Sequence, residues 1–230
     1  MNLRKNTQRL VMGVIGLGLT VPACAETFGP YVTIMGGLNW VAPHDLNQNN
    51  VNFVEVELDD SLHSGLASGL AVGWRFPVGL RPELELSYRK NALVRFNNRV
   101  YDGGGSIDAK GEERASSLMA NLWYEGFNLP ASFSRFSPYI GGGVGYIDLS
   151  VSGLKAGGVS FGGTHRDTVM AYQLGAGFGY ELSQQWAMLL EYRYLKTRTA
   201  HFGDIQGLPP GDVSMTYGAQ SLMLGLRYGF

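Results

Sequence analysis

Residues 221–230, SLMLGLRYGF, end this 230-residue chain and decide its fold. From Leu222 to Phe230 every second residue is leucine or aromatic, and the residues between them are Met, Gly, Arg and Gly. Alternation with a period of two is the pattern of a β-strand whose two faces meet different surroundings. Most chains end in a polar, loosely held tail, so this apolar end predicts a strand that pairs within a sheet.

The same alternation recurs seven times upstream. In GLASGLAVGWRF, residues 65–76, one face carries Leu70, Val72 and Trp74, and the other carries small residues and Arg75. The remaining stretches are YVTIMGGLNW (31–40), RPELELSYRK (81–90), SLMANLWYEGF (117–127), YIGGGVGYIDL (139–149), AYQLGAGFGYEL (171–182) and WAMLLEYRYL (186–195). With residues 221–230 they predict eight strands in a single domain.

The composition agrees with a strand-rich chain and argues against one class of partner. Charged residues make up 16% of the chain, below the roughly 25% of an ordinary soluble domain, and 33 residues are glycine. The formal net charge is -1, with a pI near 6.4. Such a chain has no excess of basic residues to attract a polyanion, so nucleic acid is not expected as a partner.

The amino terminus has the pattern of a secretory signal peptide. Arg4, Lys5 and Arg9 precede the apolar run LVMGVIGLGLTVPACA, in which the small residues Ala23 and Ala25 flank Cys24. An A-x-A pattern places cleavage before residue 26. We therefore expect a signal peptide over residues 1–25 and a mature domain over residues 26–230. Lipid modification of Cys24 is the alternative, which the proline of VPAC disfavours.

The predicted connections alternate between long and short. Residues 41–64, 97–114, 152–167 and 196–216 are long and polar, whereas those around 77–80, 127–137 and 183–185 are shorter. In an antiparallel meander this alternation places all long loops at one end. Outer-membrane barrels have this asymmetry, with short periplasmic turns and long outer loops.

Two barrel types remain, and they differ in which face points inward. A secreted lipocalin-like barrel also has eight strands, but its bulky apolar residues point inward. Here the face opposite the apolar one combines small residues with charges of both signs, which suits the lumen of a narrow membrane barrel. Aromatic residues gather near strand ends on the apolar face, as an interfacial girdle requires: Trp40, Trp74, Phe76, Tyr88, Tyr124, Tyr180, Tyr228 and Phe230.

We therefore predict an all-β fold, an eight-stranded antiparallel up-and-down transmembrane β-barrel with four long outer loops and short periplasmic turns. Four arginines and five glutamates share the inward parity, and an unpaired charge there would cost several kcal/mol. The lumen is therefore predicted to hold a network of paired charges. Its expected members are Arg75, Glu85, Arg89, Glu191, Arg193 and Arg227.

The order of several segments resembles that of the small outer-membrane β-barrels of Gram-negative bacteria, related to the OmpA-type membrane domain and to opacity-type surface antigens. The segments are ELELSYR, FSPYIGGGVGY, YQLGAGFGYEL, LLEYRYL and LGLRYGF. This resemblance implies location in the outer membrane, contact with its lipid and lipopolysaccharide, and insertion by the barrel-assembly machinery. It further implies that the machinery reads an assembly signal formed by Leu222, Leu224, Leu226, Tyr228 and Phe230.

The function expected from these features is structural and surface-interacting: envelope integrity, with loops available for adhesion or antigen presentation and for a host surface ligand. The alternative is a small porin or a conduit for hydrophobic ligands, because the glycine-rich face of residues 141–145 and 175–179 would leave space in the lumen. Conductance separates these two hypotheses.

No catalytic residue, metal site or cofactor is predicted. His44, His63, His165 and His201 all fall in the long polar segments, without the spacing of metal ligands. His63 beside Ser64 is similar to the Ser and His of outer-membrane lipid A deacylases, but neighbours in a loop do not form a triad. An outer-membrane protease of the omptin type would need ten strands. We therefore do not expect an enzyme.

Overall fold

The computed structural model describes residues 28–41, 44–48, 51–57, 65–98, 106–127, 129–156, 159–160, 163–203 and 212–230. The predicted signal peptide, including Ala23 and Ala25, lies outside these residues. Within the described ranges, no helix has the length and apolar character needed to cross a membrane.

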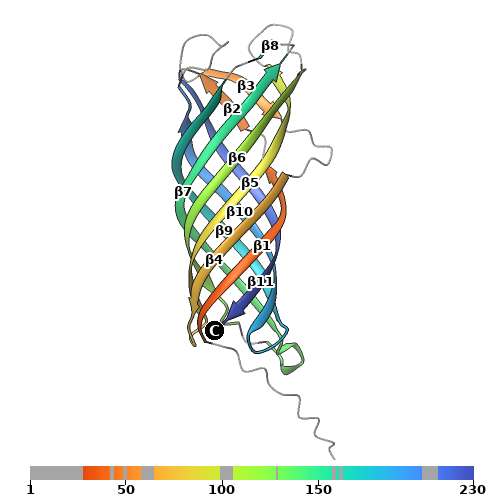
Figure 1. Cartoon of the computed structure of the whole chain (residues 1–230), viewed down its shortest axis with the longest axis vertical. Helices are drawn as coiled ribbons and strands as arrows, with labels where there is room; N and C mark the ends of the chain where they lie inside the picture. The colour runs from red at the N-terminus through yellow and green to blue at the C-terminus, as the bar shows by residue number, and fades with distance from the viewer. Residues whose placement is uncertain are drawn as a thin grey trace, which may run out of the picture.

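Eight long antiparallel strands form a closed barrel, in which each strand is tilted against the long axis (Figure 1). They are β1 (Gly29–Val41), β4 (Gly65–Arg75), β5 (Leu80–Asn98), β6 (Ser106–Tyr124), β7 (Phe136–Ala156), β9 (Thr164–Glu181), β10 (Trp186–His201) and β11 (Val213–Gly229). Three short strands, β2 (His44–Gln48), β3 (Val51–Glu57) and β8 (Val159–Ser160), and one 3-10 turn, Ala131–Phe133, complete the described elements. The predicted eight-stranded antiparallel fold is confirmed.

The barrel closes between its first and last strands. β11 pairs with β1 over eleven residue positions, from Gly229 opposite Tyr31 to Ala219 opposite Val41. At the lower end, the amide of Phe230 donates a hydrogen bond of 3.1 Å to the carbonyl of Pro30. The stretch SLMLGLRYGF is thus the strand that removes the sheet edge, which bilayer hydrocarbon would not tolerate because nothing there can bond to free backbone groups.

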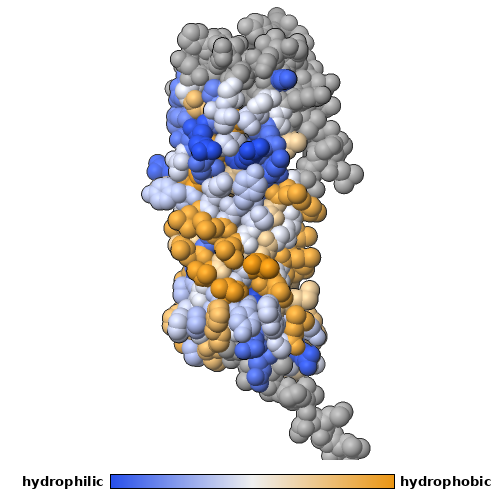
Figure 2. Space-filling model, viewed as in Figure 1, coloured by the Kyte–Doolittle hydropathy of each residue, from blue (hydrophilic) through white to orange (hydrophobic). Residues whose placement is uncertain are grey.

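The alternation predicted from the sequence determines which side chains point outward. In β4, Leu66, Leu70, Val72 and Trp74 are exposed, while Ala67 and Ala71 are buried. The outward apolar residues form a hydrophobic band around the lower and middle parts of the barrel (Figure 2). The apolar face therefore points away from the lumen, opposite to a lipocalin-like barrel.

The aromatic residues expected at strand ends lie on the outer surface. At the lower end they form pairs, such as Trp186 with Tyr228 at 4.8 Å and Phe136 with Tyr180 at 5.0 Å between ring centroids. Tyr228 also contacts Phe230 at 5.2 Å. Tyrosine and tryptophan prefer the boundary between lipid and water, so this ring of aromatics marks the lower membrane boundary.

The strands continue further into the long segments than the sequence predicted. Strand β6 begins at Ser106, β10 reaches His201 and β11 begins at Val213, all inside residues that were expected to be loops. The hairpin β2–β3 pairs with β11 on one side and β5 on the other, so the backbone wall continues beyond the shorter β1 and β4. Backbone pairing does not require an apolar face, so the extension leaves a weaker period-two pattern in the sequence.

The assignment of faces predicts opposite behaviour for two adjacent residues of β11. Leu224 is 60% exposed and Met223 is 1% exposed. In a Cys24→Ser chain, a fluorophore on Leu224→Cys should be strongly quenched by brominated lipid, whereas Met223→Cys should label poorly and show little quenching. Fluorescence in vesicles of brominated and ordinary lipid measures this, and equal quenching at both positions would contradict the assignment.

Candidate functional site in the barrel lumen

Charged side chains of both signs fill the lumen from its lower end to about mid-height, where Arg89 lies level with Ala115 and Leu149. Five arginines and five glutamates project inward and are almost completely shielded from solvent. They are Arg75, Arg81, Arg89, Arg193, Arg227, Glu83, Glu85, Glu125, Glu181 and Glu191. The opposite charges balance one another, which limits the desolvation cost of burying them.

A first group of ion pairs lies near the lower end and centres on Glu125. Its carboxylate lies 2.8 Å from Arg75 Nε, 2.8 Å from Arg81 Nε and 2.9 Å from Arg227 Nη1. Arg227 also contacts Glu181 at 3.1 Å, and Arg75 does so at 3.5 Å. Three arginines from different strands thus share one carboxylate, which ties β4, β5 and β11 to the end of β6.

A second group lies further up the lumen and centres on Arg193. This guanidinium forms ion pairs with both Glu85 and Glu191, so it joins β10 to β5. Glu85 also accepts a hydrogen bond of 2.9 Å from the Asn121 amide and one of 3.3 Å from Gln173. Buried charges are tolerated when additional donors satisfy their remaining lone pairs, which these amides do for Glu85.

Aromatic side chains fill the space between the two charged groups. Trp123 is fully buried and donates from Nε1 to Glu83 at 3.2 Å, and its ring packs edge-on against Tyr139 at 5.6 Å. The Arg81 guanidinium lies 5.0 Å from the centroid of the Tyr139 ring and 5.7 Å from that of Trp123. Cation–π contacts of this kind gain strength where water is excluded.

The glycine row opposite Trp123 makes room for its ring. A Cβ atom at Gly175 would lie 2.8 Å from the indole, and one at Gly141 would lie 2.7 Å from it. Both distances are below any ordinary carbon contact. The glycines that suggested open space in the lumen are therefore occupied, in this region, by the side chain of Trp123.

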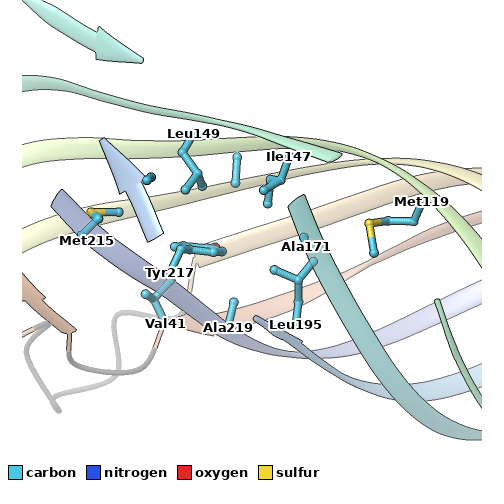
Figure 3. Packing of buried hydrophobic residues seen from close by; sticks show 11 residues of the cluster. Val41, Met119, Ile147, Leu149, Ala171, Leu195, Met215, Tyr217 and Ala219 are labelled. Atoms are coloured by element: carbon cyan, nitrogen blue, oxygen red, sulfur yellow. The ribbon is translucent and has the colours of Figure 1, made fainter. Parts of the chain in front are cut away.

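The upper part of the lumen is mostly apolar, although Glu113 is also buried there, beside Asn91 in the strand register. A cluster of buried residues from six long strands fills it, with Ile147, Leu149, Met215 and Tyr217 each no more than 1% exposed. Figure 3 shows these side chains pointing toward one another across the barrel. The lumen thus has a charged lower part and a mostly apolar upper part that holds one buried carboxylate, Glu113, and this change along the barrel was not predicted from the sequence.

The structure brings most of the predicted charge network together. Arg75, Glu85, Arg193 and Arg227 take part in the ion pairs described above, and Glu191 contacts both Arg193 and the Tyr139 hydroxyl, at 2.9 Å from the latter. Arg89 is held differently: its Nη1 donates to the Ser87 hydroxyl at 2.9 Å.

Several lumen residues were missed by the sequence analysis. Arg81 has the inward parity, two positions before Glu83, and this signal was available in the stretch RPELELSYRK. Tyr31, whose hydroxyl donates to Glu83 at 2.9 Å, and Gln173 gave no comparable signal, because a single polar residue on the inward face does not reveal its partner across the barrel.

Two of the four histidines have described side-chain surroundings at the outer end. His201 Nδ1 lies 2.5 Å from Asp212 Oδ2, and this hydrogen bond holds the pKa of Asp212 below its usual range. His165 lies in β9, His44 lies in β2, and His63 lies outside the described residues. In the described part of the chain, no three His, Cys, Asp or Glu residues are grouped so that they could hold a metal ion.

Comparison with known proteins places this barrel in a family. The family model that describes the outer membrane protein beta-barrel domain matches residues 11–230 of this chain. Outer membrane protein W of Vibrio cholerae is 21% identical over 190 residues, which are 82% of this chain and 83% of that protein. The crystal structure of OprG from Pseudomonas aeruginosa has the same fold, with a TM-score of 0.54, 15% identity, and coverage of 90% of this chain and 99% of that chain.

A closed barrel with an apolar band on its outer surface and its charged side chains turned inward defines a transmembrane β-barrel protein. The chain belongs to the outer membrane protein beta-barrel domain family. It is a small outer-membrane protein, and its short-turn end, which carries residue 230, corresponds to the periplasmic side. The longer connections then lie on the extracellular side.

The ion pairs of Arg193 predict a large loss of stability when this residue is removed. Arg193→Met should lower the free energy of unfolding by about 3–5 kcal/mol, because Glu85 and Glu191 lose their cationic partner inside the lumen. Urea titration of the barrel refolded into lipid vesicles measures this change.

The same substitution at an exposed ion pair is the matched control. Arg166 is 66% exposed and contacts Asp148 at 3.3 Å, so Arg166→Met should change stability by less than about 1 kcal/mol. Equal effects of the two substitutions would show that the lumen pairs do not stabilise the barrel more than a surface pair does.

Proposed function

We propose that this protein is a closed, non-enzymatic barrel that stabilises the outer membrane and presents its extracellular end to surface ligands. The observation that carries this proposal is the packing of the lumen. Arg81, Trp123, Arg193 and Tyr217 are among its largest side chains, and each is no more than 1% exposed. An eight-stranded barrel has an interior just wide enough for side chains to fill.

The two parts of the lumen oppose the passage of an ion in different ways. In the lower part an ion would have to separate pairs such as Arg227 and Glu181, at a cost of several kcal/mol for each charge left without a partner. In the upper part it would have to leave its water among apolar side chains such as Leu149 and Met215. Two barriers in series support a closed lumen.

The extracellular end supports the surface-interaction part of the proposal. The barrel wall continues there through the extended strands and the β2–β3 hairpin, so it provides a rigid base for the connecting loops. Loops on a rigid scaffold are the usual place for specific binding. A host surface ligand would be recognised at this end.

Membership of the family supports an assembly partner as well. The alternating row runs along β11 and ends on Phe230, directly after the strand; its members are Leu222, Leu224, Leu226, Tyr228 and Phe230. Of these, Leu222, Leu224 and Phe230 are between 43% and 64% exposed. Our proposal includes recognition of this row by the barrel-assembly machinery during insertion.

A second function is favoured by the apolar upper lumen. A side-chain cluster formed by Ile147, Leu149, Leu195 and Met215 would accept a small hydrophobic molecule if these residues moved apart. The protein would then be a conduit for hydrophobic ligands, and the packed state would be its resting state. A conduit, unlike a static core, requires saturable binding of an apolar probe to the lumen.

Planar-bilayer recording tests the closed lumen. Barrels whose folding is verified by a heat-dependent shift in gel mobility should produce no regular single-channel steps, while a general porin in the same bilayer does. Regular steps of large conductance from the folded barrel would overturn the closed-lumen proposal. Saturable binding of an apolar fluorescent probe, abolished by filling the cluster with Ala171→Leu, would instead support the conduit.

A further inference from the structure

One wall of the barrel changes from apolar to hydroxyl-bearing to cationic over three successive outward rows. The strand register aligns Leu70, Leu86, Leu118, Tyr146 and Met170 in the lowest row, across β4, β5, β6, β7 and β9. The next row holds Ser68, Tyr88, Ser116, Asp148 and Thr168, and the row above it holds Leu66, Lys90, Arg114, Ser150 and Arg166. Successive rows are about 7 Å apart along the strands.

The lowest row is the upper edge of the hydrophobic band. Its members are between 44% and 60% exposed, so they face the surroundings of the barrel. In the view of Figure 2, hydrophilic residues lie directly above this band. Because the long connections are extracellular, the rows above the band lie at the outer boundary of the membrane.

A groove of about 680 Å³ runs between the lowest and the middle row. Leucines of the lowest row form its lower side, and hydroxyl side chains such as Ser116, Thr168 and Tyr88, together with the Asp148 carboxylate, form its upper side. Serine, threonine and tyrosine hydroxyls both donate and accept hydrogen bonds, which matches the chemistry of a sugar.

The top row presents cations to whatever occupies the groove. The Lys90 side chain is 48% exposed, that of Arg114 is 51% exposed and that of Arg166 is 66% exposed. From β5 to β9 this row spans three strand spacings, about 14 Å. Arginine binds phosphate through two parallel hydrogen bonds, and lysine binds it as a point charge.

Two carboxylates compete for these cations without cancelling them. Glu112 contacts Lys90 at 2.7 Å and also contacts Arg114, and Asp148 contacts Arg166 at 3.3 Å. These pairs are exposed at the surface, where an ion pair contributes little stability. Each guanidinium has five N–H donors, so Arg114 and Arg166 can bind a phosphate while they remain near their carboxylates.

We propose that this wall binds a phosphorylated glycolipid of the outer leaflet, the chemical class of lipopolysaccharide. Its acyl chains would lie on the lowest row, its sugar rings in the hydroxyl-lined groove, and its phosphates against Lys90, Arg114 and Arg166. The order of the three rows matches the order of the three parts of such a lipid. The proposal deepens the proposed function, because it rests on the placement of the barrel in the outer membrane.

Native mass spectrometry of the folded barrel in detergent tests the proposal, with diphosphoryl lipid A as the probe. Lys90→Gln with Arg114→Gln should weaken lipid A binding by about tenfold or more, because each cation near an anionic lipid surface contributes substantially to binding. The matched control is Lys196→Gln with Arg198→Gln, which removes one lysine and one arginine from exposed outward positions of β10. The control should weaken binding by less than about twofold.

Two further binding measurements show whether the phosphates of a lipid, rather than free phosphate, are recognised. Lipid A without phosphates should bind the wild type and both variants equally, and millimolar inorganic phosphate should not displace diphosphoryl lipid A. Equal binding by the wild type and the Lys90/Arg114 variant would overturn the proposal, as would an equal loss in the control or displacement by free phosphate. All proteins must show the same heat-dependent mobility shift. Mass spectrometry measures lipid binding independently of conductance. A barrel that conducts ions would therefore overturn the proposed closed lumen without affecting the test of lipid A binding.

Discussion

The structure depends on one constraint: every backbone N–H and C=O group inside the membrane needs a protein partner, because hydrocarbon offers none. The pairing of β11 with β1 meets it, since it removes the two edges that an open sheet would expose. The alternation in SLMLGLRYGF follows from this pairing. A strand held on both sides turns alternate residues to lipid and to the lumen, so Leu224 and Arg227 must differ in character.

Closure also determines the interior. A barrel of eight strands encloses a narrow lumen, and the side chains that enter it must fit one another as they do in a protein core. Glycine at positions 141 and 175 gives Trp123 its space. The ion pairs of Arg75 with Glu125 and of Arg193 with Glu85 connect strands that are not neighbours in the sheet. The same side chains that neutralise one another therefore also fill the interior of the barrel.

The strands, the lipid-facing surface and the inward position of the charges were predictable from the sequence, because a period of two assigns each residue to a face without knowledge of distant partners. The partners themselves were not. Gln173 and Glu85 are 88 positions apart and meet only because the sheet is closed. The apolar upper lumen was also missed, since inward residues such as Leu149 and Leu195 lie at the ends of the predicted stretches, where the alternation merges with the extended strands.

Disulfide formation across the closing seam tests the central claim most directly. Leu38 of β1 lies opposite Leu222 of β11, and both side chains point outward. In a Cys24→Ser chain, Leu38→Cys with Leu222→Cys should cross-link rapidly and in high yield on mild oxidation of the folded barrel, whereas Leu38→Cys with Leu226→Cys should not. Absence of the first cross-link, or equal yields from the two pairs, would contradict a barrel closed in this register.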